Sequence, residues 1–212
     1  MKNLEKELAK ELFEIKAFFY RPEEPFLWAS GIKSPVYCDN RLTLSFPNVR
    51  NKIVKGLINI IKENYSDVEM IIGTITAGIP HAALVAQEMK LPMGYARGYA
   101  KNHGRKNKIE GNLSKGLNVV VVEDLISTGG SVLEVVKALR EEGLNVLGVV
   151  SIYTYNLESA VKNFKDYNVK NISLTNFDAV MEIAKEYNYI SDEDIKKIVA
   201  FRKNPTDESW IA

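Results

Sequence analysis

The feature that most constrains the fold of this chain is a run of four valines, Val119–Val122, followed by two acids and a small-residue loop. An apolar strand without polar alternation is typical of a parallel sheet that is covered on both faces. Directly after the loop, the apolar residues of segment 132–139 recur at the spacing of one helix face. This order of strand, acids, loop and helix predicts an α/β fold.

The rest of the chain alternates between helical and strand patterns. We expect helices over about 4–19, 49–61, 81–89, 132–142, 157–166, 176–188 and 191–202, strands over about 68–72, 92–96, 119–122, 145–153 and 169–174, and an extended segment over 26–44. Pro80 fits the first position of a helix. Ser131 and Glu134 have the spacing of a capping box, which places a helix start at Ser131. The alternation implies a parallel sheet with right-handed crossovers.

Two loops should face one crevice. In open α/β sheets, ligands bind beyond the carboxyl ends of the strands, and loops 73–80 and 123–131 lie at such ends. In the second loop, glycines let the backbone approach an anion, and the free N–H groups of the helix start would hold a phosphate. The acids Glu123 and Asp124 would face hydroxyl groups or a divalent metal. The combination predicts a sugar-phosphate site.

Composition excludes several other classes of protein. The 212 residues suit one α/β domain with an appended subdomain, and the net charge of +1 gives no reason to expect a nucleic-acid or membrane surface. No apolar run is long enough for a membrane-spanning helix, and the charges throughout residues 1–20 do not fit a signal peptide. The single cysteine, Cys38, fits a reducing compartment. We expect a cytoplasmic protein.

A cationic segment precedes the valine strand. Residues 97–109, called here the basic arm, contain no acid but five basic residues and a histidine: Arg97, Lys101, His103, Arg105, Lys106 and Lys108. Taken alone, such a segment is a solvated loop. Beside a phosphate loop, a cationic arm can also close over an anionic substrate and offset the charge that develops on a leaving group.

The segment Val119–Ser131 resembles the thirteen-residue motif that binds phosphoribosyl pyrophosphate (PRPP) in type I phosphoribosyltransferases, where four apolar residues and two acids precede Thr-Gly-Gly-Ser. Two further segments resemble the orotate phosphoribosyltransferase family in particular. Ser30–Asp39 is similar to its S-G-x-K-S-P hood segment, where the base is recognised. Arg97–Gly104 is similar to its catalytic loop, R-x-x-x-K-x-H-G. The likeness runs from about residue 10 to residue 210.

The resemblance implies a type I phosphoribosyltransferase fold, with an N-terminal helix and hood segment over residues 1–45, a core over 46–212 and a flexible catalytic loop. It implies transfer of the phosphoribosyl group of PRPP to orotate, giving orotidine 5′-monophosphate and pyrophosphate in the de novo synthesis of UMP. It also implies a Mg²⁺ cofactor held mainly by PRPP, with Asp124 as a further ligand. Finally, it implies a homodimer in which the basic arm of one subunit covers the site of the other.

The resemblance also assigns roles to single residues. Arg97, Lys101 and His103 would be catalytic, because they would stabilise the departing pyrophosphate. PRPP would contact these three residues and Glu123, Asp124, Leu125, Ile126, Ser127, Thr128, Gly129, Gly130 and Ser131. The two acids would hold the ribose hydroxyls, and backbone N–H groups of loop 73–80 would bind pyrophosphate. Orotate would contact Ser127, Lys33 and Tyr37.

The chain departs from the family pattern at Ala29, Ala77, Gly98 and Tyr155, where members of the family often carry basic residues. Those four contacts are therefore not carried over, and Lys33 and the backbone amides of the hood are the candidates for recognising the orotate carboxylate.

Other assignments remain open. A phosphoribosyltransferase for another nucleobase would share the thirteen-residue motif but not the hood motif. A non-catalytic PRPP-sensing regulator would need a DNA-reading module, and residues 1–45 offer one helix without a second, basic one. A PRPP synthase-like enzyme would need an ATP site, which the sequence does not offer. Tyr37 fits core packing as well as base stacking, and we expect Trp28, Cys38, His81 and Trp210 to be structural.

Overall fold

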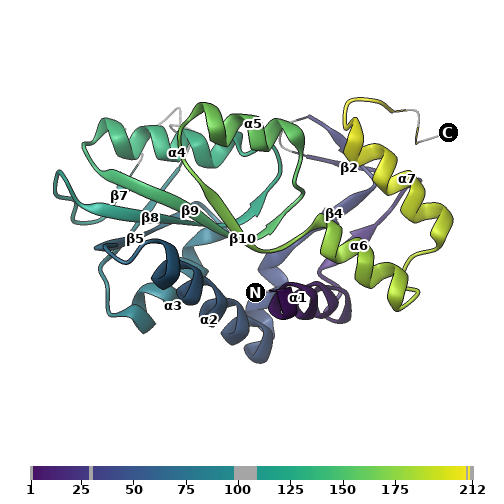
Figure 1. Cartoon of the computed structure of the whole chain (residues 1–212), viewed down its shortest axis with the longest axis horizontal. Helices are drawn as coiled ribbons and strands as arrows, with labels where there is room; N and C mark the ends of the chain where they lie inside the picture. The colour runs from purple at the N-terminus through teal and green to yellow at the C-terminus, as the bar shows by residue number, and fades with distance from the viewer. Residues whose placement is uncertain (1, 29–30, 98–108, 209, 211–212) are drawn as a thin grey trace.

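The computed structural model describes residues 2–28, 31–97, 109–208 and 210. Among these residues a six-stranded sheet forms the centre, in the order β10-β9-β8-β5-β6-β7 (Figure 1). Its strands are β5 (Met70–Thr74), β6 (Met93–Ala96), β7 (Ile109–Glu110), β8 (Asn118–Ile126), β9 (Asn145–Thr154) and β10 (Asn171–Asn176). All neighbouring strands are parallel except β6 and β7. The predicted α/β fold with a parallel sheet is confirmed, with one antiparallel edge strand.

Helices cover both faces of the sheet (Figure 1). α2 (Pro47–Asn64) and α3 (Gly78–Met89) lie on one face, and α4 (Gly130–Glu141) and α5 (Glu158–Asp166) lie on the other. The four valines of β8 are fully buried and divide between two cores: Val119 and Val121 pack on the α4 side, whereas Val120 and Val122 pack on the side of α2 and α3. The valine run therefore places β8 in the middle of the sheet.

The N-terminal part begins with helix α1 (Lys2–Glu14) and continues into the hood, defined here as residues 18–45. The hood comprises the short strands β1 (Phe18–Tyr20), β2 (Phe26–Leu27), β3 (Lys33–Ser34) and β4 (Val36–Cys38) and the 3₁₀ helix η1 (Asn40–Ser45). β1 pairs antiparallel with β4, and β2 pairs antiparallel with β3.

Two predictions for this part are wrong. The first helix does not extend to Phe19, because Lys16 adopts a positive φ of 55° and Phe18–Tyr20 pairs with β4. Segment 26–44 is not extended throughout, because the Asp39 side chain accepts a hydrogen bond from the Arg41 N–H and caps the 3₁₀ helix η1. This second difference places Arg41 in a tight turn.

The C-terminal helices α6 (Phe177–Glu186) and α7 (Asp192–Lys203) pack beside α1 and the hood, at the yellow-green end of the view in Figure 1. The Tyr20 hydroxyl donates to Asp194 Oδ1 at 2.6 Å, and the rings of Trp28 and Phe201 meet edge to face at 5.8 Å. These contacts cross the predicted boundary at residue 45. None of the described helices combines the length and apolar character that a bilayer crossing requires.

Candidate active site

A crevice with a volume of about 440 Å³ opens beyond the carboxyl ends of β5 and β8. Four segments line it: the hood, the loop after β5, the end of β8 with its following loop, and Tyr155 directly after β9. The lining residues are Leu27, Trp28, Tyr37, Cys38, Arg41, Ile75, Thr76, Ala77, Glu123, Asp124, Leu125, Ser127, Ser131 and Tyr155. Residues of loops 73–80 and 123–131 therefore do face one crevice, as the strand order predicts.

The acid pair lies within β8, not after it. The ladder between β8 and β9 continues as far as Ile126 opposite Thr154, so the predicted strand end at Val122 is wrong. The Glu123 side chain is 8% exposed. Its Oε1 accepts a hydrogen bond from the Thr74 hydroxyl at 2.6 Å and one from the Asp124 N–H at 3.0 Å. The neighbouring strand thus fixes the direction of the Glu123 carboxylate.

Burial shifts the titration of both acids. Burial raises the pKa of Glu123 well above its usual value, and the adjacent charge of Asp124 raises it further. Burial also raises the pKa of Asp124. Hydroxyl groups that donate hydrogen bonds to these oxygens would favour the charged forms. The pair is therefore suited to a ligand with neighbouring hydroxyls, as in a sugar.

The loop between β8 and α4 turns at Gly129, whose φ is +78°. Gly129 is the N-cap of α4, and no side chain of the described residues caps this helix, so the predicted capping box at Ser131 is wrong. The helix begins before Ser131 because the left-handed turn at Gly129 already ends the loop. An added Cβ at Gly129 would lie 2.8 Å from the Phe164 ring. The first N–H groups of α4, without a side-chain partner at the cap, fit an anion.

The loop after β5 brings the start of α3 to the same crevice. α3 begins at Gly78, so the prediction of Pro80 as its first residue is wrong. A Cβ at Gly78 would lie 2.3 Å from Thr74 Oγ1 and 2.5 Å from the Val122 carbonyl oxygen. The absence of a side chain at Gly78 therefore lets α3 start directly against β5 and β8. The lining residues Ile75, Thr76 and Ala77 form the turn between them.

The hood supplies the third wall. The Tyr37 ring stacks on Phe26 with centroids 5.4 Å apart, so Tyr37 both packs against the hood and lines the crevice. Cys38 is fully buried, and burial raises the pKa of its thiol well above the usual value, which agrees with the structural role expected for it. The Cys38 N–H donates to the Tyr155 hydroxyl oxygen at 3.1 Å.

The structure adds residues that sequence reasoning missed. Asn40 is fully buried, and its side-chain amide donates to the Asp124 carbonyl oxygen at 2.8 Å. The neighbouring Arg41 lines the crevice, and Thr74 positions Glu123. The polar run Asp39-Asn40-Arg41 after an extended segment was the available sequence signal, because such runs favour capped turns.

Several predicted site residues lie elsewhere. Lys101 and His103 fall outside the described residues. Arg97 is half-buried and Lys33 is exposed, and neither lines the crevice; Lys33 Nζ donates to Glu208 at 2.9 Å. The predicted PRPP contacts that do not line the crevice are Ile126, Thr128, Gly129 and Gly130. Ser127, Ser131, Leu125, Tyr37 and the two acids do line it.

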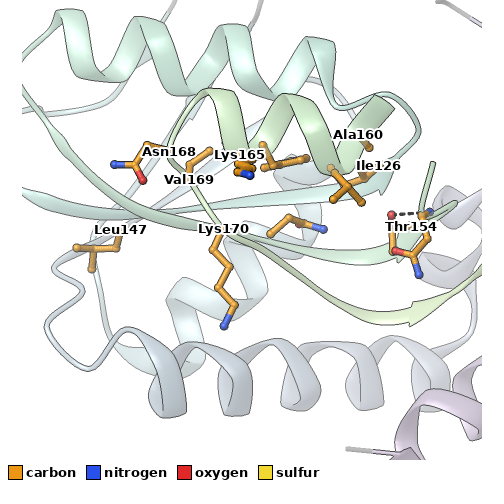
Figure 2. Close-up of a pocket in the computed structure, with 12 residues that line it drawn as sticks. Ile126, Leu147, Thr154, Ala160, Lys165, Asn168, Val169 and Lys170 are labelled. Atoms are coloured by element: carbon orange, nitrogen blue, oxygen red, sulfur yellow. Dashed lines mark hydrogen bonds between the residues drawn. The ribbon is translucent and has the colours of Figure 1, made fainter. Parts of the chain in front are cut away.

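A second groove, of about 480 Å³, lies between α5 and the strands β9 and β10 (Figure 2). Lys165, Lys170, Asn168 and Thr154 contribute its polar groups, and Ile126 and Val169 contribute apolar ones. Among the described residues that line this groove, none carries a carboxylate, and only Ile126 comes from the two predicted loops. The crevice is therefore the candidate active site, although the groove is slightly larger.

The acid pair fits a magnesium ion only together with phosphate oxygens. Within the described part of the chain, no group of three or more Asp, Glu, His or Cys side chains could hold a metal ion. Mg²⁺ is commonly bound through one or two carboxylates plus substrate phosphates, with water in the remaining positions. The described residues therefore do not provide a complete metal site of their own.

The fold and the crevice together define a phosphoribosyltransferase. The sequence pattern of the Phosphoribosyl transferase domain matches residues 47–187, from the first residue of α2 to the residue after α6. Within this class, the chain belongs to the orotate phosphoribosyltransferase family. It is 55% identical to the orotate phosphoribosyltransferase of Bacillus mycoides (strain KBAB4) over 208 residues, which cover 98% of this chain and 99% of that protein.

Solved structures agree with this assignment. The structure of orotate phosphoribosyltransferase from Aeropyrum pernix is similar with a TM-score of 0.74 and 28% identity, covering 87% of this chain and 99% of that one. The structure of Leishmania donovani UMP synthase is similar with a TM-score of 0.79 and 25% identity, covering 93% of this chain and 42% of that one.

Proposed function

We propose that the chain transfers the phosphoribosyl group of PRPP to orotate, giving orotidine 5′-monophosphate and pyrophosphate for pyrimidine synthesis. The observation that carries the proposal is the crevice, in which a buried acid pair lies between a phosphate-type helix start and the hood. The family to which the chain belongs supports the same substrates.

The described residues suggest where each part of PRPP binds. The 5′-phosphate would accept hydrogen bonds at the start of α4 and from the hydroxyls of Ser127 and Ser131. The ribose 2′- and 3′-hydroxyls would donate to Glu123 and Asp124. The pyrophosphate would lie against the turn of Ile75, Thr76 and Ala77, beside the start of α3.

In the reaction, N1 of orotate gives up its proton and forms a bond to C1′ of the ribose, while the bond from C1′ to the pyrophosphate oxygen breaks. The electron pair of that bond leaves with pyrophosphate, which can take up the released proton. Glu123 and Asp124 would stabilise positive charge that develops on the sugar. From the resemblance, Arg97, Lys101 and His103 would offset negative charge on the departing pyrophosphate. A histidine with an ordinary pKa near 6.5 can also donate a proton there.

The proposal includes Mg²⁺ held mainly by PRPP, with Asp124 as the possible protein ligand, because the described residues offer no fuller set. When bound, the ion would neutralise charge on the leaving pyrophosphate. We also propose a cytoplasmic homodimer in which each basic arm covers the site of the other subunit.

The first test follows the loss of orotate absorbance with PRPP and Mg²⁺ for the wild type, Lys101→Ala and the control Lys165→Ala. Lys165 is an exposed lysine of the second groove, so its variant should keep wild-type activity. We expect consumption that requires both PRPP and Mg²⁺ and that falls at least about 100-fold in Lys101→Ala. If PRPP binds but orotate is not consumed, the base assignment is wrong, and another nucleobase or a sensing role would have to be considered.

Shared sites have their own test. If the basic arm acts in the partner's site, mixing the inactive Lys101→Ala variant with an inactive Glu123→Gln variant should restore part of the activity, because mixed dimers would contain one intact site. An unchanged, inactive mixture, with subunit exchange verified, would contradict arm sharing but not the reaction itself.

A further inference from the structure

The crevice must accommodate a base that carries a carboxylate, if the proposed function holds. Its wall contains two acids, which would repel that group. Among the described residues that line the crevice, Arg41 is the only cation. The four positions at which the family often carries a basic residue are here Ala29, Ala77, Gly98 and Tyr155. A carboxylate in this crevice therefore has one positively charged partner within the described wall.

Arg41 is held close to the acid pair through the backbone. The preceding residue, Asn40, is fully buried and its side-chain amide donates to the carbonyl oxygen of Asp124 at 2.8 Å. This bond ties the 3₁₀ helix η1 to the end of β8. Since Arg41 follows Asn40 directly, the tie fixes its Cα beside the acid pair.

The guanidinium of Arg41 is also oriented. Its Nε donates to Asp39 Oδ1 at 2.6 Å and its Nη2 donates to Asp39 Oδ2 at 2.8 Å. A guanidinium has five N–H donors, so this fork leaves Nη1 and one hydrogen of Nη2 without a partner in the described structure. Fork geometry is suited to a second carboxylate on the free edge.

The candidate indicated by the resemblance, Lys33, is not part of the crevice wall. Lys33 lies in β3, its Nζ is paired with Glu208 at 2.9 Å, and it does not line the crevice. Tyr155 is fully buried, and its hydroxyl accepts from the Cys38 N–H. Tyr37, whose ring packs on Phe26, offers a face for the ring of the base but no positive charge.

We infer that Arg41 recognises the carboxylate of orotate, and that Asp39 and Asn40 position it. This inference rests on the proposed function. In this arrangement the base lies between the Tyr37 side of the hood and the acid pair, with its carboxylate directed toward η1. The specificity for a carboxylated pyrimidine then comes from the hood, through a residue that follows the S-G-x-K-S-P segment.

The test measures the KM for orotate, the KM for PRPP and the inhibition constant of orotamide, the uncharged carboxamide analogue. We expect Arg41→Ala to raise the KM for orotate about 10- to 100-fold, because a charge-assisted hydrogen-bond pair is lost. The KM for PRPP and the orotamide constant should each change by less than about threefold. Arg41→Lys should recover part of the loss, and Asp39→Asn should cause a smaller rise, since the arginine remains but is no longer held.

Arg21→Ala is the matched control. Arg21 is an exposed arginine of the same hood that lies over the Phe19 and Phe26 rings and does not line the crevice. The KM of the Arg21→Ala variant for orotate should therefore stay at the wild-type value. Thermal unfolding of each variant identifies one that fails to fold; if Arg41→Ala fails, Arg41→Lys and Asp39→Asn carry the test.

The outcomes separate the two proposals. A wild type that does not consume orotate with PRPP overturns the proposed function. A wild type that is active, with Arg41→Ala within about threefold in its KM for orotate, overturns the inference alone. An equal loss for orotate and orotamide, a rise confined to the KM for PRPP, or a large rise in Lys33→Ala but not in Arg41→Ala would also overturn it.

Discussion

Glu123 carries a carboxylate in a nearly closed environment. It accepts hydrogen bonds from Thr74 and from the Asp124 N–H, yet burial and the charge of Asp124 raise its pKa. A charged group with such a pKa destabilises the empty protein at neutral pH, whereas the same charge would stabilise bound hydroxyls. At this residue, stability without ligand and affinity for ligand therefore oppose each other.

We predict that Glu123→Gln raises the free energy of unfolding at pH 7 by roughly 1–3 kcal/mol, because the glutamine oxygen can still accept both hydrogen bonds and no charge is buried. The affinity for PRPP should fall about 10-fold or more, since the ribose loses a charged acceptor. Urea unfolding and PRPP titration measure the two effects.

The pH dependence provides a check on the cause. A carboxyl whose folded pKa is raised contributes stability below its unfolded pKa, near 4.5, and loses it as the pH rises through the folded pKa. The higher free energy of unfolding of Glu123→Gln relative to the wild type should therefore vanish near pH 4. The control Glu88→Gln changes an exposed acid of α3, and its free energy of unfolding should not differ from the wild type in this pH-dependent way. If both variants gained stability equally, the cause would be the change in net charge and not the burial of Glu123.

At the scale of elements, α3 and α4 begin in a similar way. Each follows a central strand, each has no side-chain cap, and each start lies at the crevice. Gly78 and Gly129 allow these starts for different reasons: Gly78 through close approach of α3 to two strands, and Gly129 through a positive φ. The two uncapped helix starts leave N–H groups for the two phosphate-bearing ends of PRPP.

Gly78→Ala should destabilise the fold by about 1–3 kcal/mol, because its Cβ would meet the Val122 carbonyl oxygen, a backbone atom inside the sheet that cannot move aside. PRPP binding should weaken as well, since Thr74 must shift and Thr74 orients Glu123. Chemical unfolding of Gly130→Ala is the comparison: a Cβ there has its nearest neighbour at 3.8 Å, so stability should hold or rise slightly. Equal losses in both variants would refute the steric argument.

Local patterns predicted most elements but not their junctions. The helices and strands from α2 to α7, apart from β7 and β8, lie within about three residues of their expected limits, because each carries its own apolar period. The two-residue strand β7 was not predicted, because it forms only by pairing with β6. β1 was missed because Phe18–Tyr20 becomes a strand only through β4, about twenty residues away. β8 extends through its acids because β9 continues beside it.

As with the fold, the sequence predicted the part of the site that lies within one local motif. The sequence motif indicated the acid pair, Ser127 and Ser131, all of which line the crevice. The roles of Asn40, Arg41 and Thr74 depend on contacts between segments 49 to 84 residues apart, such as the bond from Asn40 to Asp124, and no local spacing encodes them. The roles assigned to Lys101 and His103 stay predictions.

For the molecule as a whole, buried polar groups couple stability to pH. His81 in α3 is buried, and its Nδ1 has no hydrogen-bond partner among the described residues. Burial, with a further contribution from the charge of Arg50, lowers its pKa from 6.5 to about 4. This agrees with the structural role expected for it and makes His81 a source of acid sensitivity.

A histidine whose pKa is lower in the folded state does not reduce the free energy of unfolding above pH 6.5. This free energy then falls as the pH drops from about 6.5 to about 4. We predict a loss of up to about 3 kcal/mol over this window from His81 alone. Urea unfolding across the window should give a flatter profile for His81→Gln. His103→Gln, which alters the other histidine of the chain, should retain the wild-type slope. If His103→Gln flattened the profile and His81→Gln did not, the assignment of the acid sensitivity to His81 would be wrong.

The packing of Trp28 against Phe201 has a consequence for how the protein becomes active during its synthesis. The phosphate-binding half of the crevice needs β9 beside β8, and Asn163 of α5, whose side-chain amide donates to the Thr128 carbonyl oxygen. These segments leave the ribosome before the C-terminal helices α6 and α7. The wall that contains Trp28 lacks its support until Phe201 has emerged from the exit tunnel. A nascent chain would thus hold PRPP before it can hold the base, and catalysis would begin only when the last helix docks.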